Sequence, residues 1–342
     1  MKNFSIDVCH EAIMGMCRPL MAYDEKCDYL EWRKEVKEKL TELLGDMPEK
    51  IEPKLRIEWQ KGYEAFVEYR LIFFSEEHVE VPCHLWIPKK ASKPCPVVIC
   101  LQGHSTGMHI SMGRPVFAGD EKLIAGGDRD FARQIVKEGY AALILEQRGF
   151  GSRKSECELA SKPDANTTCV HPAMVAMLIG RTLIGERVWD ISRAIDILNE
   201  FPEIDTERVA VMGNSGGGTA AFYAACMDER IKVVMPSCSV CTYKRSITAT
   251  RHCSCNYIPG AAKYFDMGDL SCLIAPRKII VVAGEQDNDF FIDGVRDAYA
   301  TIKKVYEKAG EPNNCQLVIG SEGHRFYAEQ SWPVFRKLSG WS

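Results

Sequence analysis

Several features that would set a function class are missing from this sequence. It has no apolar run near the roughly 18 to 20 residues that a membrane-spanning helix needs, so we expect no membrane partner. It has no excess of positive charge, because 43 Lys and Arg stand against 47 Asp and Glu, and a nucleic-acid partner is therefore not expected. Asp7, His10 and Glu11 interrupt the region where a signal peptide needs an apolar core, so we expect a cytoplasmic protein.

Internal repeats, low-complexity linkers and a dinucleotide-binding glycine pattern are also absent. The missing G-x-G-x-x-G motif at a strand end argues against a bound dinucleotide cofactor. What the sequence does contain is 46% apolar and 26% charged residues over 342 positions, which is typical of a globular protein with a large core.

Cysteine is abundant, but its distribution does not suggest disulfide bonds. The fifteen cysteines are odd in number and scattered, and some, such as Cys100, lie within strand-like apolar runs. We therefore expect reduced thiols. The tightest group is Cys238, Cys241, Cys253 and Cys255, which could in principle hold a tetrahedral metal, but Cys253 and Cys255 are separated by one residue where structural zinc sites usually have two to four. We expect no metal site there.

The N-terminal part of the sequence predicts helices followed by a hairpin at the edge of a sheet. Residues 11–45 have the apolar spacing and charged partners of helices and end at Gly45, and we assign residues 1–60 to a helical N-terminal extension. The extension could form an interface between two copies of the chain or pack on its own sheet. Residues 66–74 and 78–87 alternate apolar and polar side chains around a polar turn, which predicts an antiparallel hairpin.

The rest of the chain alternates buried strands with helices. Short unbroken apolar runs occur at residues 97–101, 141–145, 209–212, 231–235 and 279–282, separated by helical patterns at 130–138, 185–201, 216–226 and 294–308. This order predicts an α/β fold with a mainly parallel sheet covered on both faces, in one domain over residues 61–342. Residues 152–182 and 237–277 break the alternation and are candidate lid segments.

The strongest chemical signal is a G-x-S-x-G motif at residues 213–217, between a predicted buried strand and a predicted helix. A sharp turn in that position exposes the hydroxyl of Ser215 above the sheet, and this is what a nucleophilic serine requires. The amide of Gly216 lies at the helix N-terminus, where it can donate a hydrogen bond to an oxyanion.

A base and an acid should follow the serine in that order. His252 and His324 are the two histidines downstream, and His324 lies in a loop after the strand-like residues 316–319, where a base belongs. The loop after residues 279–282 offers Glu285, Asp287 and Asp289 as the acid, and we favour Asp287.

A second oxyanion donor should come from the loop after an early strand, here residues 101–107. We choose the backbone amide of His104, whose side chain could also line the substrate pocket or be purely structural. Arg148 and Arg181 could orient a polar substrate, or instead pair with acids of the scaffold such as Asp190.

Other stretches make the pattern more specific than the serine motif alone: residues 101–104, 146–151, 180–181, 187–190, 274–277, 284–287 and 323–324. With them, the chain from about residue 60 onward resembles the α/β-hydrolase superfamily, and within it the branch of dienelactone hydrolases and acetyl xylan esterases. Residues 251–260 resemble the same segment of uncharacterised bacterial members. The resemblance implies that Ser215, Asp287 and His324 form the catalytic triad. True dienelactone hydrolases carry Cys where this chain has Ser215, so that activity is not expected.

The sequence therefore predicts a serine hydrolase that cleaves a short-chain carboxylic ester through an acyl-enzyme and without a cofactor, with acetylated sugars as candidate substrates. A serine peptidase of the prolyl-oligopeptidase type shares this triad, but the residues before the sheet are too few for a propeller domain. A non-catalytic binding protein on the same fold is the alternative of another class.

Overall fold

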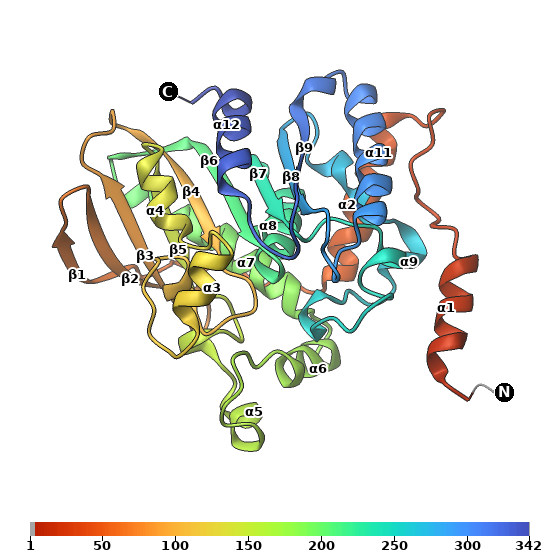
Figure 1. Cartoon of the computed structure of the whole chain (residues 1–342), viewed down its shortest axis with the longest axis horizontal. Helices are drawn as coiled ribbons and strands as arrows, with labels where there is room; N and C mark the ends of the chain where they lie inside the picture. The colour runs from red at the N-terminus through yellow and green to blue at the C-terminus, as the bar shows by residue number, and fades with distance from the viewer. Residues whose placement is uncertain (1–3, 342) are drawn as a thin grey trace.

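A nine-stranded sheet forms the centre of the molecule in the computed structural model, which describes residues 4–341 (Figure 1). The strand order across the sheet is β1-β2-β3-β5-β4-β6-β7-β8-β9. The strands are β1 (Arg56–Gly62), β2 (Phe66–Glu76), β3 (Val79–Pro88), β4 (Cys95–Leu101), β5 (Ala141–Leu145), β6 (Ile204–Asn214), β7 (Ile231–Ser237), β8 (Lys278–Gly284) and β9 (Cys315–Gly320).

The sheet is antiparallel at its N-terminal edge and parallel from β5 onward. β1 pairs with β2, β2 with β3 and β3 with β5 in antiparallel register, and the pairs from β5–β4 to β8–β9 are parallel. The predicted hairpin is β2–β3, and every predicted buried run is a strand. The predicted fold class is therefore confirmed. In a parallel sheet the carboxyl ends of the strands meet at one edge, which is where β4, β6, β8 and β9 all end.

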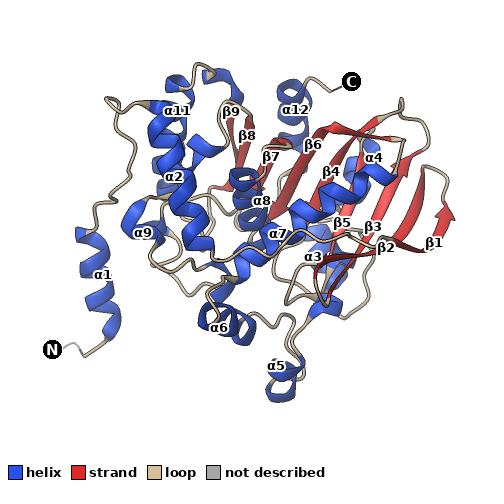
Figure 2. Cartoon of the chain, turned by 180° about the vertical axis from the view of Figure 1, so that it is seen from behind, coloured by secondary structure: helices blue, strands red, loops and turns tan. Residues whose placement is uncertain are grey.

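Helices cover both faces of the sheet. The helices of residues 4–341 are α1 (Ile6–Met16), α2 (Tyr29–Leu44), α3 (Asp120–Gly126), α4 (Phe131–Lys137), α5 (Glu156–Ser161), α6 (Val170–Leu178), α7 (Leu183–Asp196), α8 (Gly216–Met227), α9 (Ala261–Tyr264), α10 (Met267–Leu270), α11 (Ile292–Lys308) and α12 (Ala328–Ser339). Figure 1 shows α4 and α12 in front of the sheet, and Figure 2, from behind, shows α2, α7 and α8.

Successive side chains of one strand point to opposite faces of the sheet and join two separate hydrophobic cores. On β4, Val97 and Ile99 join the core shared with α2, α7, α8 and α11, whereas Val98 and Cys100 join the core shared with α4 and α12. Because both faces are covered, the central strands read as unbroken apolar runs instead of alternating ones.

The N-terminal helix α2 is part of the main core. Its inward face buries Trp32, Val36, Leu40 and Leu44. The side chain of Lys37 donates hydrogen bonds to the carbonyls of Cys226 and Met227 at the end of α8, at 2.8 and 2.9 Å. The sequence left open whether the N-terminal extension forms an interface between two copies or packs on its own sheet. Helix α2 of this extension packs within its own chain.

Strand β1 was not predicted. It crosses residue 60, where the predicted extension ends, and all seven of its residues are exposed at the sheet edge. Without burial there is no requirement for a strict alternation of apolar and polar residues, so the sequence pattern there is weak.

The two candidate lid segments contain short helices instead of regular α/β units. Residues 152–182 hold α5 and α6, and residues 237–277 hold α9 and α10 with several single-turn helices. Phe265, Leu270 and Cys272 of the second segment are buried in the main core. Among residues 4–341, no helix is long and apolar enough to cross a membrane.

The burial of α2 predicts that it is required for stability. Leu40 is fully buried, so Leu40→Ala should lower the free energy of unfolding by about 2–5 kcal/mol. Leu30 on the same helix is 74% exposed, and Leu30→Ala is the matched control with an expected change below about 0.5 kcal/mol. Urea unfolding followed by circular dichroism measures both. Equal, small effects would mean that α2 is a detachable extension.

Candidate active site

Ser215 occupies the turn between β6 and α8. Its backbone has φ 56° and ψ −126°, a conformation that costs a non-glycine residue energy and persists only where the surroundings impose it. Two hydrogen bonds hold it: the Ser215 amide donates to the Ser237 carbonyl, and the Thr219 amide donates to the Ser215 carbonyl, both at 2.8 Å. The serine is partly exposed while the glycines around it are buried.

The glycines of the motif are required by close backbone packing. A Cβ atom on Gly217 would lie 2.2 Å from the Leu101 carbonyl oxygen, and one on Gly213 would lie 2.5 Å from the backbone of Gly217. A Cβ on Gly103 would lie 2.9 Å from the Asn214 carbonyl oxygen. The end of β4 therefore lies directly against the serine turn, and no larger residue fits at these contacts.

His324 and Asp287 form a hydrogen-bonded pair at the same edge of the sheet. His324 lies in the loop after β9, and its Nδ1 is 2.9 Å from Oδ2 of Asp287, which follows β8. The other carboxylate oxygen of Asp287 accepts the amides of Asp289 and Phe290 at 2.8 and 3.1 Å. Burial raises the pKa of Asp287, but the hydrogen bond and charge of His324 and these amides outweigh it, so the pKa falls below its usual value.

The two other candidate acids are placed differently. Glu285 pairs with Arg296 at 3.0 Å on the surface. Asp289 is more than half exposed, and its carboxylate is 4.0 Å from Nδ1 of His324. His252, the other downstream histidine, contacts the Asp289 carbonyl oxygen through Nε2 at 3.1 Å. Among the three acids, the geometry therefore favours Asp287 as the carboxylate partner of His324.

Ser215 and His324 line one cavity of about 320 Å³. Nδ1 of His324 is hydrogen-bonded to Asp287, so Nε2 is the ring nitrogen that can act on a group bound in the cavity. The other lining residues are His104, Leu123, Arg129, Arg251, His252, Cys253, Asn256, Asp289 and Phe290. A neighbouring cavity of about 980 Å³ shares His104, Arg251, His252 and Cys253, and its remaining walls come from residues 158–177 and 254–260. Both candidate lid segments therefore border the site.

The two candidate oxyanion donors lie close to the serine turn. Gly216 is the first residue of α8, where the backbone amides have no partner within the helix. His104 follows β4, and its ring lies over Gly216, because a Cβ there would be 2.6 Å from Cε1 of the imidazole. The His104 side chain does not point into solvent: its Nε2 is 3.1 Å from Sγ of Cys255.

The structure separates the four cysteines that the sequence grouped together. Cys238 lies beside Asp287 and His324 and donates to the Arg325 carbonyl at 3.2 Å. Cys241 contacts the carbonyls of Arg245 and Phe291. Cys253 and Cys255 instead gather with His104 and Cys169. All fifteen cysteines of the chain are free thiols.

These thiols differ in acidity. Burial raises the pKa of Cys83, in β3, to about 12. Burial and Cys169 raise the pKa of Cys255 as well, but Cys253, Arg187 and His104 outweigh them and bring it below the usual value. A buried thiol whose pKa lies below its usual value needs positive charge close to it.

Arg148 and Arg181 pair within the scaffold. Arg148 donates to Asp190 at 2.9 Å and to Glu76 at 2.7 Å, and Arg181 donates to Glu76 at 2.8 Å. The network is largely buried and connects β2 to α7 and the loop after β5. Of the two roles left open by the sequence, the structure supports pairing with scaffold acids.

Arg129 is a cavity residue that sequence reasoning missed. It is 8% exposed, and within residues 4–341 no carboxylate lies at ion-pair distance from it and its Nε has no hydrogen-bond partner. A long hydrogen bond of 3.5 Å runs from its Nη2 to the His324 carbonyl. A single arginine in the polar stretch 126–130 carries no motif, so only the folded arrangement identifies it.

Comparison with known proteins places this geometry in a family. The model of the Abhydrolase family matches residues 5–330. The chain is 28% identical over 320 residues to YtaP of Bacillus subtilis, which is described as a hydrolase, covering 90% of this chain and 99% of that one.

Two solved structures share the fold. A Bacteroides fragilis protein described as a candidate acetyl xylan esterase superposes with a TM-score of 0.80 at 17% identity, covering 98% of this chain and 96% of that chain. A glucuronoyl esterase from Solibacter usitatus superposes with a TM-score of 0.68 at 18% identity, covering 91% of both. Because the family model spans most of the sequence and the nine-stranded sheet agrees with it, this chain belongs to the Abhydrolase family and has the α/β-hydrolase fold.

Proposed function

We propose that this chain is a serine-dependent carboxylic ester hydrolase that acts through an acyl-enzyme on Ser215. One observation carries the proposal: the strained Ser215 and His324, which is hydrogen-bonded to Asp287, line the same cavity. This combination matches the requirements of an activated nucleophile, in which a base oriented by a carboxylate faces the hydroxyl.

Each group has one role in the reaction. His324 accepts the proton of the Ser215 hydroxyl as its oxygen attacks the ester carbonyl, and the amides of Gly216 and His104 donate to the oxyanion. When the tetrahedral intermediate collapses, His324 returns the proton to the leaving alcohol. It then takes a proton from water, the hydroxide attacks the acyl-enzyme, and the acid leaves as Ser215 regains its proton.

The cavities support a short acyl group and a bulkier alcohol. The cavity at Ser215 is about 320 Å³ and is lined by charged and imidazole side chains among others, whereas the neighbouring cavity is about 980 Å³. An acetyl group fits the smaller space, and a sugar-sized alcohol fits the larger one. The names of the two structural neighbours, an acetyl xylan esterase candidate and a glucuronoyl esterase, agree with an ester of a carbohydrate as the substrate.

The first test is the loss of ester hydrolysis on removing the nucleophile or the base. Ser215→Ala and His324→Ala should each lower kcat on p-nitrophenyl acetate by about 10³-fold or more, because neither proton transfer nor acyl transfer can then proceed. The wild type should prefer the acetate over the butyrate and the octanoate. Ser321→Ala, an exposed serine in the His324 loop, is the control and should retain full activity. Activity that survives Ser215→Ala would overturn the assignment, and activity on peptides alone would favour a peptidase.

The second test separates the three acids. Asp287→Asn preserves size but replaces one acceptor oxygen with an NH2 donor and removes the charge that orients His324, so kcat should fall by about 10²- to 10⁴-fold. Glu285→Gln and Asp289→Asn should change kcat by less than about 5-fold, since neither carboxylate contacts the imidazole at hydrogen-bond distance. Steady-state kinetics at one pH, with melting temperatures to confirm folding, decide among them. A larger loss for Asp289→Asn would move the acid to that position.

The third test concerns the charge in the cavity. Arg129 lacks a carboxylate partner, so it should bind an anionic group of the substrate, and hydrogen bonds to charged groups contribute about 1.5–3 kcal/mol. Arg129→Gln should therefore lower kcat/KM for a carboxylate-bearing acetate ester by about 10- to 100-fold, with a much smaller effect on p-nitrophenyl acetate. Arg129→Lys retains the charge and should recover part of the loss. An equal decrease in kcat/KM on both esters would mean that Arg129 stabilises the His324 loop and does not bind the substrate.

A further inference from the structure

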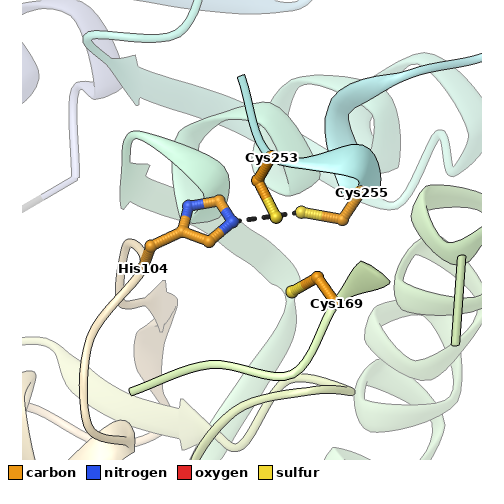
Figure 3. Close-up of side chains that lie close together, drawn as sticks. All are labelled: His104, Cys169, Cys253 and Cys255. Atoms are coloured by element: carbon orange, nitrogen blue, oxygen red, sulfur yellow. Dashed lines mark hydrogen bonds between the residues drawn. The ribbon is translucent and has the colours of Figure 1, made fainter. Parts of the chain in front are cut away.

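Four side chains from three distant segments converge beside the serine turn. His104 comes from the loop after β4, Cys169 from the N-terminus of α6, and Cys253 and Cys255 from the single-turn helix at residues 254–256 and its start. One ligand atom from each lies within 4.8 Å of all the others, and Nε2 of His104 is 3.1 Å from Sγ of Cys255. Figure 3 shows the imidazole and the sulfur atoms directed toward one another.

This set has the composition of a structural zinc site. Three cysteines and one histidine are a common tetrahedral zinc ligand set, with Zn–S near 2.3 Å and Zn–N near 2.0 Å. Tetrahedral geometry at those lengths places the ligand atoms about 3.5–3.8 Å apart. The four ligand atoms already lie within 4.8 Å of one another, close to this range. Soft thiolates select zinc over magnesium or calcium.

The charge of the surroundings is a second, independent observation. Arg187 of α7 is fully buried, with Nη2 3.3 Å from Sγ of Cys169 and its guanidinium 4.4 Å from the centre of the Phe150 ring. No carboxylate among residues 4–341 lies at ion-pair distance from it, and its Nη1 has no hydrogen-bond partner in that range. A buried cation needs a compensating negative charge. Zn²⁺ with three thiolates and a neutral imidazole carries one net negative charge, which Arg187 balances.

We propose that His104, Cys169, Cys253 and Cys255 bind one Zn²⁺ as a closed structural site with Arg187 as its counter-charge. With four protein ligands no coordination position is left for water, so the metal takes no part in ester cleavage. Its effect is to tie both lid segments to the loop after β4. The hydroxyl of Ser254 already joins two of these segments by donating to the Cys169 carbonyl at 3.0 Å.

The site also fixes the wall of the proposed active site. His104 and Cys253 line both cavities, and Cys169 lines the larger one. Coordination through Nε2 would lock the His104 ring over Gly216, and with it the loop whose amide is a candidate oxyanion donor. This consequence rests on the proposed function, whereas zinc binding itself does not.

Metal content tests the site without any measurement of activity. The full chain is purified without a histidine tag or chelator, and zinc is measured by plasma mass spectrometry. We expect about one zinc per wild-type chain and below about 0.2 in Cys169→Ala and Cys255→Ala. Cys272→Ala, which removes a buried thiol outside the cluster, and Ser215→Ala should both retain about one zinc.

A second measurement covers the case in which the cysteine variants do not fold. Titration of the wild-type protein with a mercurial reagent should release zinc, detected by a chromogenic chelator. Reconstitution of metal-free protein with Co²⁺ should give a thiolate charge-transfer band and strong visible absorption typical of tetrahedral coordination. Wild-type protein that contains no zinc, and whose metal-free form shows no such bands with Co²⁺, would overturn the proposal. Zinc retained by folded Cys169→Ala and Cys255→Ala would overturn it as well, whether or not the protein hydrolyses esters.

Discussion

The close approach of the β4 end to the serine turn is the constraint on which the rest of the site depends. Gly103, Gly213 and Gly217 bring the backbones of two parallel strands and a helix to distances that exclude any Cβ atom. This contact fixes Ser215 in its strained conformation and places the loop after β4 beside the first turn of α8. A serine hydroxyl, a helix N-terminus and a second loop of backbone amides can then face the same small volume, which is the arrangement that oxyanion stabilisation requires.

Regular patterns in the sequence were sufficient to predict the fold, and the serine motif in its strand-to-helix context gave the candidate triad, which stays a prediction. Parallel strands buried on both faces give apolar runs, and these runs predicted β4 to β8 with small errors at the ends. The strand-loop context then led to Ser215, Asp287 and His324 as successive candidates, and the structure brings Asp287 and His324 to 2.9 Å. Strand β1 was missed because its seven exposed residues bury no apolar face and so show no distinctive pattern.

The cysteine cluster could not be predicted for a different reason. Sequence reasoning looked for ligands at short spacing, and so it grouped Cys238 and Cys241 with Cys253 and Cys255. In the structure the partners of Cys253 and Cys255 are His104 and Cys169, from segments about 150 and 85 residues upstream. Such a site depends on how irregular loops pack, and no periodicity encodes that packing. The role of Arg187 and the position of Arg129 in the cavity were not predicted for a similar reason: each arginine is distinguished by having no carboxylate at ion-pair distance among residues 4–341, which only the folded structure shows.

His104 connects the two halves of this site. Its backbone belongs to the loop that the glycine contacts press against Ser215, and its imidazole belongs to the cysteine cluster. A hydrolase of this fold positions its substrate with loops, and loops without regular hydrogen bonding need another source of rigidity. Arg148 anchors one side of this region through Glu76 and Asp190, and its carbonyl accepts from Arg187, which in turn contacts Cys169. A continuous chain of polar contacts thus runs from the antiparallel edge of the sheet to the cluster beside the Ser215 turn. A metal at its end would make the two candidate lid segments and the loop after β4 behave as one rigid unit.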